Sequence, residues 1–287
     1  MTDRLTRRQF LAGAIAAGAA LHSPELLAGS ARKLKSLTDR VKLGRTGIKV
    51  SYLGLGTGTK GWDHRSNQTK LGIVEFSRMI RHALDSGINF FDVADLYGTH
   101  EYLRSALKRI PREDYVIQTK IWHRTSEGAQ KTLDRSLREL GTDYIDSLLI
   151  HCVTEPGWSA DLGEMVGVLS KAKEKGVIRA HGISVHSLDV LKGAVENPWV
   201  DIVLARINHT GAKMDAPPAQ VVPALEKLHA AGKAVVGIKI LGEGTIADQR
   251  EESLRYVLGF PCVDSIIIGF ESPAQVDDIL KLGGRLL

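Results

Sequence analysis

Cysteine is scarce in this chain of 287 residues, which contains only Cys152 and Cys262. Cys152 falls just after one predicted strand and Cys262 just before another, so a parallel sheet would place them at opposite ends. A disulfide requires two Cα atoms within about 7 Å of each other. We therefore expect two buried free thiols.

Aromatic residues make up only 6% of the chain, and no basic stripe with interleaved aromatics occurs. The formal net charge is +5, and charges of both signs are scattered along the sequence. Nucleic-acid recognition relies on a concentrated basic face, so the sequence argues against a nucleic-acid partner. The pattern GxGxxG is also missing from the start of the first helix, which argues against an open dinucleotide-binding sheet.

The N-terminus is typical of an export signal. Arg7 and Arg8 lie in the twin-arginine motif TRRQFL, and the uncharged run FLAGAIAAGAAL follows. This run is too short for a stable membrane span but suits a signal peptide. Small residues permit cleavage after Ser30 or Ala31, and an amphipathic first helix is the alternative.

We therefore expect residues 1–31 to be a twin-arginine signal peptide and residues 32–287 to be the mature domain. The twin-arginine machinery exports folded proteins, which suits a protein that acquires a cofactor before export. The expected location is periplasmic or otherwise extracytoplasmic. The mature length matches one eight-fold βα barrel, which typically has about 250 residues.

The mature chain repeats a unit made of a short apolar β-rich run, a polar loop and an amphipathic helix. One such helix is predicted over 127–140 and ends at Gly141, because a glycine after the last turn permits a left-handed cap. The eight predicted strands are 51–57, 88–93, 115–120, 144–151, 178–184, 201–208, 234–239 and 264–269.

Strands that alternate with helices form parallel sheets, and eight such units close most naturally into a barrel. The sequence therefore predicts an α/β fold, a (β/α)8 TIM barrel. Ahead of its first strand, VKLGRTGIKVS contains a turn signal between two short β-prone runs. We expect a β-hairpin here that closes the floor of the barrel.

Four polar residues lie at or just past the ends of three successive strands: Asp92, Tyr97, Lys120 and His151. Parallel barrels place their catalytic residues at these carboxyl ends. An ammonium group favours phenolate and so lowers the pKa of a nearby tyrosine. Lys120 is expected to act on Tyr97 in this way, and Asp92 is expected to pair with the buried cation.

Several motifs, in order, resemble the aldo-keto reductases over nearly all of the mature chain. They are LGRTGIKVSYLGLGT, NFFDVADLYG, Lys120 and His151 on the third and fourth strands, KEKGVIRAHGIS and IIIGFESPAQV. The resemblance implies reduction of an aldehyde or ketone, possibly a sugar or another bulky carbonyl compound, by hydride from a nicotinamide cofactor. It also implies that Tyr97 is the general acid and that His151 orients the carbonyl.

The resemblance further implies a set of cofactor-binding residues, with NADP(H) preferred over NAD(H). These are Ser184, Lys239, Leu241, Gly242, Gly244, Gly269, Ser272 and Gln275. The chain departs from the family at Val185, Leu204 and Ile238, where amide and aromatic contacts to the nicotinamide are usual. An arginine common in the family is replaced by Gln275, and few residues follow Pro273, which predicts an open pocket.

Two other functions remain open from the sequence. A reductase-like barrel can bind a nicotinamide cofactor as a non-catalytic sensor or accessory subunit. A metal-dependent hydrolase is the other alternative, because His123, His186 and His209 also follow strands. No HxH pair follows the first strand, and Lys120 would place a cation among the ligands, so we expect no metal.

Overall fold

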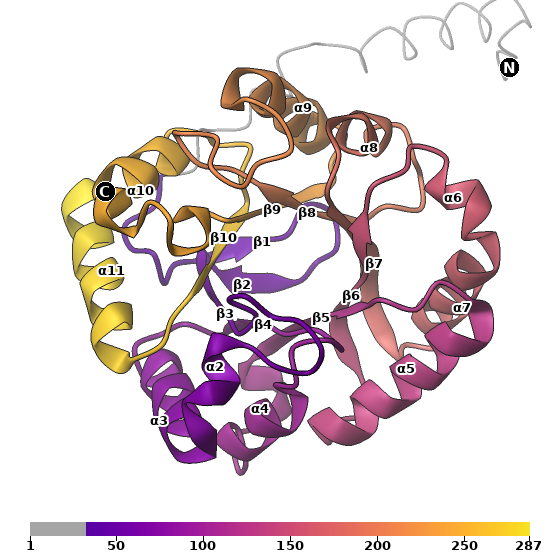
Figure 1. Cartoon of the computed structure of the whole chain (residues 1–287), viewed down its shortest axis with the longest axis horizontal. Helices are drawn as coiled ribbons and strands as arrows, with labels where there is room; N and C mark the ends of the chain where they lie inside the picture. The colour runs from indigo at the N-terminus through magenta and orange to yellow at the C-terminus, as the bar shows by residue number, and fades with distance from the viewer. Residues whose placement is uncertain (1–32) are drawn as a thin grey trace, which may run out of the picture. The chain divides into compact units, whose positions relative to one another are not determined.

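A computed structural model describes residues 33–287, so the twin-arginine motif and both expected cleavage positions lie outside the described residues. The unit Leu34–Leu287 is a closed parallel barrel with helices around it (Figure 1). Its strands are β3 (Leu53–Gly56), β4 (Phe90–Asp92), β5 (Val116–Ile121), β6 (Ile145–Val153), β7 (Ile178–Val185), β8 (Ile202–Arg206), β9 (Ala234–Ile238) and β10 (Ser265–Gly269).

The strands follow chain order around the barrel, and the last one, β10, pairs in parallel with the first, β3. Ile266 lies opposite Leu53 and Gly269 opposite Gly56 in this closing pair. All eight predicted strands are present, with ends that differ by a few residues. The predicted TIM barrel is confirmed.

Helices cover the outside of the barrel and follow most of its strands (Figure 1). They are α2 (Asn67–Lys70), α3 (Gly72–Asp85), α4 (His100–Ala106), α5 (Ser126–Leu140), α6 (Trp158–Asp161), α7 (Gly163–Glu174), α8 (Leu188–Gly193), α9 (Pro218–Ala230), α10 (Arg250–Leu258) and α11 (Pro273–Leu286). The expectation for α5 is confirmed: Thr125 caps its start, and Gly141 ends it in the left-handed region with φ 65°.

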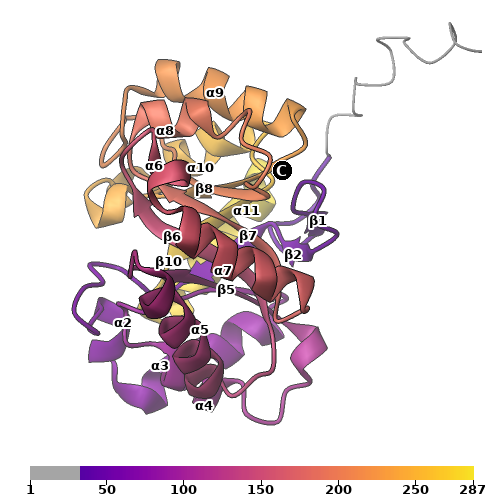
Figure 2. The ribbon, with the colours of Figure 1, turned by 90° about the vertical axis from the view of Figure 1, so that its right-hand side faces the viewer.

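A two-stranded hairpin precedes the barrel, made of β1 (Arg40–Lys42) and β2 (Lys49–Ser51). Its turn packs against the αβ connection ahead of β9, where the Arg45 backbone N–H donates to Gly232 O at 3.1 Å. Figure 2 shows the hairpin at the opposite end of the barrel from α2. The hairpin therefore closes the floor, as expected, and leaves the other end accessible.

Strand β5 illustrates how the barrel interior becomes polar near its mouth. All six of its residues are buried. Because side chains alternate along a strand, Gln118 and Lys120 share one face, and both hydrogen-bond to the carboxylate of Asp92 on the neighbouring strand. Cys152 and Cys262 are both free, as expected, but only Cys262 is buried, and Cys152 is partly exposed. No helix within residues 33–287 is long and apolar enough to cross a membrane.

Candidate active site

The four residues of the expected catalytic tetrad meet in one cavity of about 960 Å³ at the mouth of the barrel. Asp92 is the last residue of β4, Lys120 lies near the end of β5, and His151 lies near the end of β6. Tyr97 follows β4 in the loop before α4. All four line the cavity, so parallel strand order alone brings together residues that are far apart in the sequence.

Asp92 and Lys120 form a buried ion pair, with Lys120 Nζ 2.6 Å from Asp92 Oδ1 and side-chain exposures of 2% and 8%. Lys120 Nζ also donates to Val93 O at 2.9 Å, and Gln118 Nε2 donates to Asp92 Oδ1 at 2.9 Å. A buried charge without a partner is costly, and these bonds satisfy both ions. The expected pairing is confirmed.

The ring of Tyr97 lies between this ion pair and a glycine-rich loop. Lys120 Nζ is 4.9 Å from the ring centroid. On the other side, a Cβ added at Gly58 would lie 2.1 Å from Tyr97 Cε2, and one added at Gly61 would lie 2.5 Å from Cδ1. Both positions therefore exclude a side chain and allow the loop to fix the ring. The Tyr97 hydroxyl lies 3.4 Å from His151 Nε2.

The expected effect of Lys120 on the pKa of Tyr97 is wrong in direction. Burial raises the pKa of Tyr97 well above its usual value, and the negative charges of Asp92 and Asp95 add to the increase. Burial is the largest cause because it removes the ring from water and so disfavours the charged phenolate. Tyr97 is therefore a fully protonated hydroxyl at neutral pH.

His151 is positioned by an irregularity near the end of β6. The register with β7 shifts between Ile150 and Val153, and Cys152 adopts the left-handed region with φ 56°. Bulges of this kind reorient side chains beside active sites. Arg124 Nη2 secures the distorted strand end by donating to the carbonyl oxygens of residues 151 and 152. Burial, followed by nearby cations, lowers the pKa of His151 well below 6.5, so its ring is neutral.

Most of the expected cofactor-binding residues line the same cavity. Those that do are Ser184, Lys239, Leu241, Gly244, Gly269 and Gln275. Gly242 is buried, with φ 55°, and supports the loop after β9 without lining the cavity. Ser272 caps α11, where its side chain accepts the backbone N–H of Gln275 at 3.3 Å. Both residues stabilise the loops beside the cavity, and their expected contacts with a cofactor stay a prediction.

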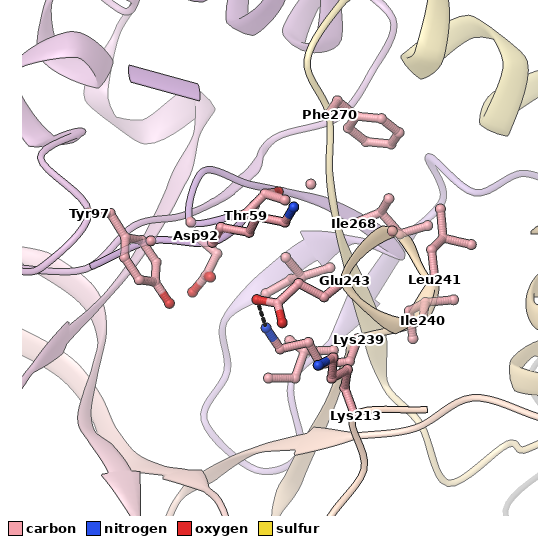
Figure 3. A pocket seen from close by; sticks show the side chains of 18 of the residues that line it. Thr59, Asp92, Tyr97, Lys213, Lys239, Ile240, Leu241, Glu243, Ile268 and Phe270 are labelled. Atoms are coloured by element: carbon pink, nitrogen blue, oxygen red, sulfur yellow. Dashed lines mark hydrogen bonds and ion pairs between the residues drawn. The ribbon is translucent and has the colours of Figure 1, made fainter. Parts of the chain in front are cut away.

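A second ion pair lies across the cavity from Tyr97 and Asp92 (Figure 3). Lys239 Nζ is 2.8 Å from Glu243 Oε1. Burial raises the pKa of Glu243, but the hydrogen bond and the charge of Lys239 outweigh it, and the pKa lies below its usual value. The expected tetrad thus lies on one side of the barrel mouth, and a charged, glycine-rich loop lies on the other.

Three of the positions expected near the nicotinamide carry apolar side chains, Val185, Leu204 and Ile238. Leu204 and Ile238 line the cavity, and Val185 is buried at the end of β7. The structure gives these positions no hydrogen-bonding side chain. Contacts to a bound ring there are therefore limited to packing, apart from the hydroxyl of Ser184.

Sequence reasoning missed several residues that complete the site. Gln118 secures Asp92, Gly58 makes room for Tyr97, and Glu243 pairs with Lys239. Asp95, two residues before Tyr97, is buried beside His151. Its presence in the DVADLY segment was the available signal, because a carboxylate inside an apolar strand end requires a partner.

Of the three other histidines that follow strands, His186 and His209 have partners within the protein, whereas His123 is exposed. His186 lines the cavity and contacts the Cys152 thiol and the Arg206 guanidinium. Burial and the charge of Arg206 lower the pKa of His186 to about 3. His209 hydrogen-bonds to Ser253 and Gln249. Residues 33–287 contain no group of three or more His, Cys, Asp or Glu placed to hold a metal ion.

Comparison with known proteins agrees with this geometry. An L-galactose dehydrogenase from Arabidopsis thaliana is 26% identical over 82% of this chain and 85% of its own length. An NADH-specific methylglyoxal reductase from Escherichia coli is 31% identical over 58% of each chain. The structure of a putative aldo-keto reductase from Pseudomonas aeruginosa matches with a TM-score of 0.72 and 25% identity, over 88% of this chain and 96% of that one.

A family model described as the aldo/keto reductase family matches residues 52–254, which include the whole tetrad and the loop after β9. The relatives are named as reductases and dehydrogenases. The protein is therefore a carbonyl oxidoreductase, and the chain belongs to the aldo/keto reductase family.

Proposed function

We propose that the protein reduces an aldehyde or ketone to an alcohol, with Tyr97 as the general acid. The observation that carries this proposal is the placement of the Tyr97 hydroxyl 3.4 Å from His151 Nε2 within the cavity. A carbonyl oxygen beside both groups would receive the Tyr97 proton. The high pKa of Tyr97 keeps that proton in place until charge develops on the oxygen.

The chain has groups that fit a nicotinamide dinucleotide, which supplies a hydride when bound. Lys239 and the backbone at Gly244 suit its pyrophosphate, since ammonium and exposed amide groups bind phosphate oxygens. At the β10 end of the cavity, Gly269 allows the strand to lie close to Thr59. A Cβ at position 269 would lie 2.3 Å from Thr59 Oγ1. The hydroxyl of Ser184 is the polar group available to the carboxamide.

Replacement of Tyr97 by phenylalanine tests the proposed acid. We expect kcat for a reducible aldehyde to fall by about 10²- to 10⁴-fold, which is the usual contribution of general acid catalysis. Binding of NADPH, measured by its fluorescence, is expected to stay unchanged because the hydroxyl is proposed to act on the substrate and not on the cofactor. Unchanged turnover in Tyr97→Phe would remove Tyr97 as the acid. Cofactor binding by the wild type without reduction of any carbonyl would instead favour a sensor.

For the substrate, we propose a sugar or another bulky carbonyl compound. The volume of about 960 Å³ supports this, as does the exposed Trp62, which packs edge-on against Trp122 at 5.3 Å beside the site. Relatives named L-galactose dehydrogenase and D-galacturonate reductase are consistent with it. A substrate panel tests the proposal, and tight selectivity for a small aliphatic aldehyde would contradict it.

For the cofactor, the proposal is NADP(H), as the family resemblance implies. Arg250 supports it, since Arg250 lines the cavity and its guanidinium pairs with Asp278 Oδ2 at 2.6 Å. NAD(H) is the second candidate, because Gln275 lacks a charge and the acidic Glu271 and Asp278 line the same region. Dissociation constants for NADPH and NADH, measured by fluorescence titration, decide between them.

We also propose export by the twin-arginine machinery to an extracytoplasmic location. The support is the sequence of residues 1–31, in which Arg7 and Arg8 precede an uncharged run. Replacement of both arginines by lysine is expected to retain the protein in the cytoplasm. Cell fractionation measures this, and an unchanged distribution of the double variant would contradict the proposal. Nucleotide released by denaturing the exported protein would reveal whether it carries its cofactor with it.

A further inference from the structure

A second carboxylate lies beside the catalytic groups and has no role in the chemistry described above. Asp95 follows β4, and its side chain is only 1% exposed. Its Oδ2 accepts the backbone N–H of Trp122 at 2.9 Å. Its Oδ1 is buried and has no hydrogen-bond partner within the described part of the chain.

His151 also has a buried polar atom without a hydrogen-bond partner among residues 33–287. This atom is Nδ1, and it lies 4.0 Å from Asp95 Oδ1. A buried polar atom left without a partner costs about 1–3 kcal/mol. Hydrogen bonds within active sites are often long before substrate binds and then shorten. A small movement of either side chain would satisfy both atoms.

We propose that Asp95 is a positioning residue: its carboxylate accepts a hydrogen bond from the protonated Nδ1 of His151. This bond directs Nε2 of the ring toward the Tyr97 hydroxyl. The inference rests on the reductase function proposed above. An ionised carboxylate can only accept hydrogen bonds, so its contact with Nδ1 requires that Nδ1 carry the proton.

The tautomer has a direct consequence for Tyr97. In a neutral ring with Nδ1 protonated, Nε2 is an acceptor and receives the hydrogen bond of the Tyr97 hydroxyl, 3.4 Å away. This bond orients the hydroxyl within the pocket. A carboxylate that orients a catalytic imidazole plays this part in other enzymes.

The other charged groups near Asp95 and His151 come from several elements. Asp95 is the acidic group beside Nδ1 of His151. They are Lys120 of β5, Arg124 after β5, His186 after β7 and Lys239 after β9 around His151, with His100 of α4 and Arg135 of α5 around Asp95. Those around His151 disfavour its protonation. Those around Asp95 favour its ionised form, although burial raises its pKa.

Nitrogen-15 NMR of the full chain labelled at histidine reads the tautomer directly, with His151→Gln to assign the signals. The wild type is expected to show a protonated Nδ1 on His151. Asp95→Asn retains an oxygen for the Trp122 N–H and turns an amide N–H toward Nδ1, so the proton should move to Nε2. An unprotonated Nδ1 in the wild type, or an unchanged tautomer in Asp95→Asn, would overturn the proposal.

Kinetics provide the second readout. We expect kcat in Asp95→Asn to fall on the order of 10- to 100-fold with little change in KM, since misplaced catalytic groups lose about this much. Asp134→Asn is the matched control, because Asp134 is exposed on α5 and its partner is Gln130. It should keep the wild-type kcat and His151 tautomer.

These measurements separate the two proposals. If the wild type reduces no carbonyl compound, the reductase function fails, while the NMR spectrum still decides the role of Asp95. If Asp95→Asn does not fold, the wild-type spectrum alone decides it. A wild-type kcat in a folded Asp95→Asn would count against positioning.

Discussion

Lys120 carries its charge into the interior of the barrel, and Asp92 makes that burial tolerable. Burial lowers the pKa of Lys120, whereas the charge and hydrogen bond of Asp92 act in the opposite direction. Removing one member of a buried ion pair typically costs about 3–5 kcal/mol, because the other charge is left unpaired. The pair therefore affects stability, whatever its part in the proposed reaction.

This pair leads to a prediction at the level of single residues. Lys120→Met should lower the free energy of unfolding by about 3 kcal/mol, and Asp92→Asn combined with Lys120→Met should recover much of the loss. Urea unfolding measures both. Lys131→Met is the control, because Lys131 pairs with Glu127 on the surface and should change stability by less than about 1 kcal/mol. Equal losses in the single and double variants would contradict this account.

The sequence was sufficient to find the tetrad but not its electrostatics. Asp92, Lys120 and His151 follow apolar strands, and such strand ends meet at one face of a barrel. The direction of the Tyr97 pKa shift depends first on burial and then on the negative charges of Asp92 and Asp95. Those are three-dimensional quantities, so no sequence pattern encodes them.

At the level of elements, the loop after β3 determines where Tyr97 can lie. Gly58 faces the ring so closely that an added Cβ would overlap it. Runs of apolar residues predict where the strands lie. A close approach between a loop backbone and a ring is marked in the sequence by a glycine alone. Glycines in loops have many causes, and this one was therefore not identified from the sequence.

Gly58→Ala should displace Tyr97 and reduce kcat on the order of 100-fold, as expected for a catalytic group moved by about 1 Å. Gly167→Ala on α7 is the matched control, since a Cβ there meets nothing within 4 Å. Helical alanine is favoured over glycine by about 0.5–1 kcal/mol, so the control should be slightly more stable and equally active. Steady-state kinetics and thermal unfolding measure these effects; wild-type kcat in Gly58→Ala would show that the loop adapts.

At the level of the whole molecule, two partly buried groups make the fold sensitive to acid. Burial raises the pKa of Asp201, but hydrogen bonds from His181 and Lys173 outweigh it and hold the pKa at about 2. His186, with a pKa of about 3, stays neutral well below 6.5. In both cases the unfolded chain takes up protons before the folded one, so stability falls as the pH falls.

The expected pH ranges differ for the two groups. His186 should reduce stability progressively from pH 6.5 down to about 3, and Asp201 from 3.8 down to about 2. Urea unfolding at successive pH values measures the slope. His186→Gln should flatten the slope between pH 6.5 and 3, whereas the exposed His123→Gln should leave it unchanged. An identical slope in His186→Gln would exclude His186 as a source.

The architecture as a whole was predictable because the same βα unit recurs and because α/β repeats of this number close into a barrel. The floor hairpin was predictable from the turn at Arg45-Thr46-Gly47. The roles of Gly242 and Ser272 were not, since the resemblance identifies the loops but not which of their residues face the cavity. Loop conformation depends on contacts between segments distant in the sequence.

Closure of the barrel joins β3 to β10, which lie near opposite ends of the described chain. Contacts between such distant segments form late, because the intervening chain must first be ordered. Gly56 and Gly269, which end these two strands, both line the cavity. A ribosome-bound chain that has not yet released β10 therefore lacks part of the pocket wall. The binding pocket is therefore complete only after translation has passed the last strand.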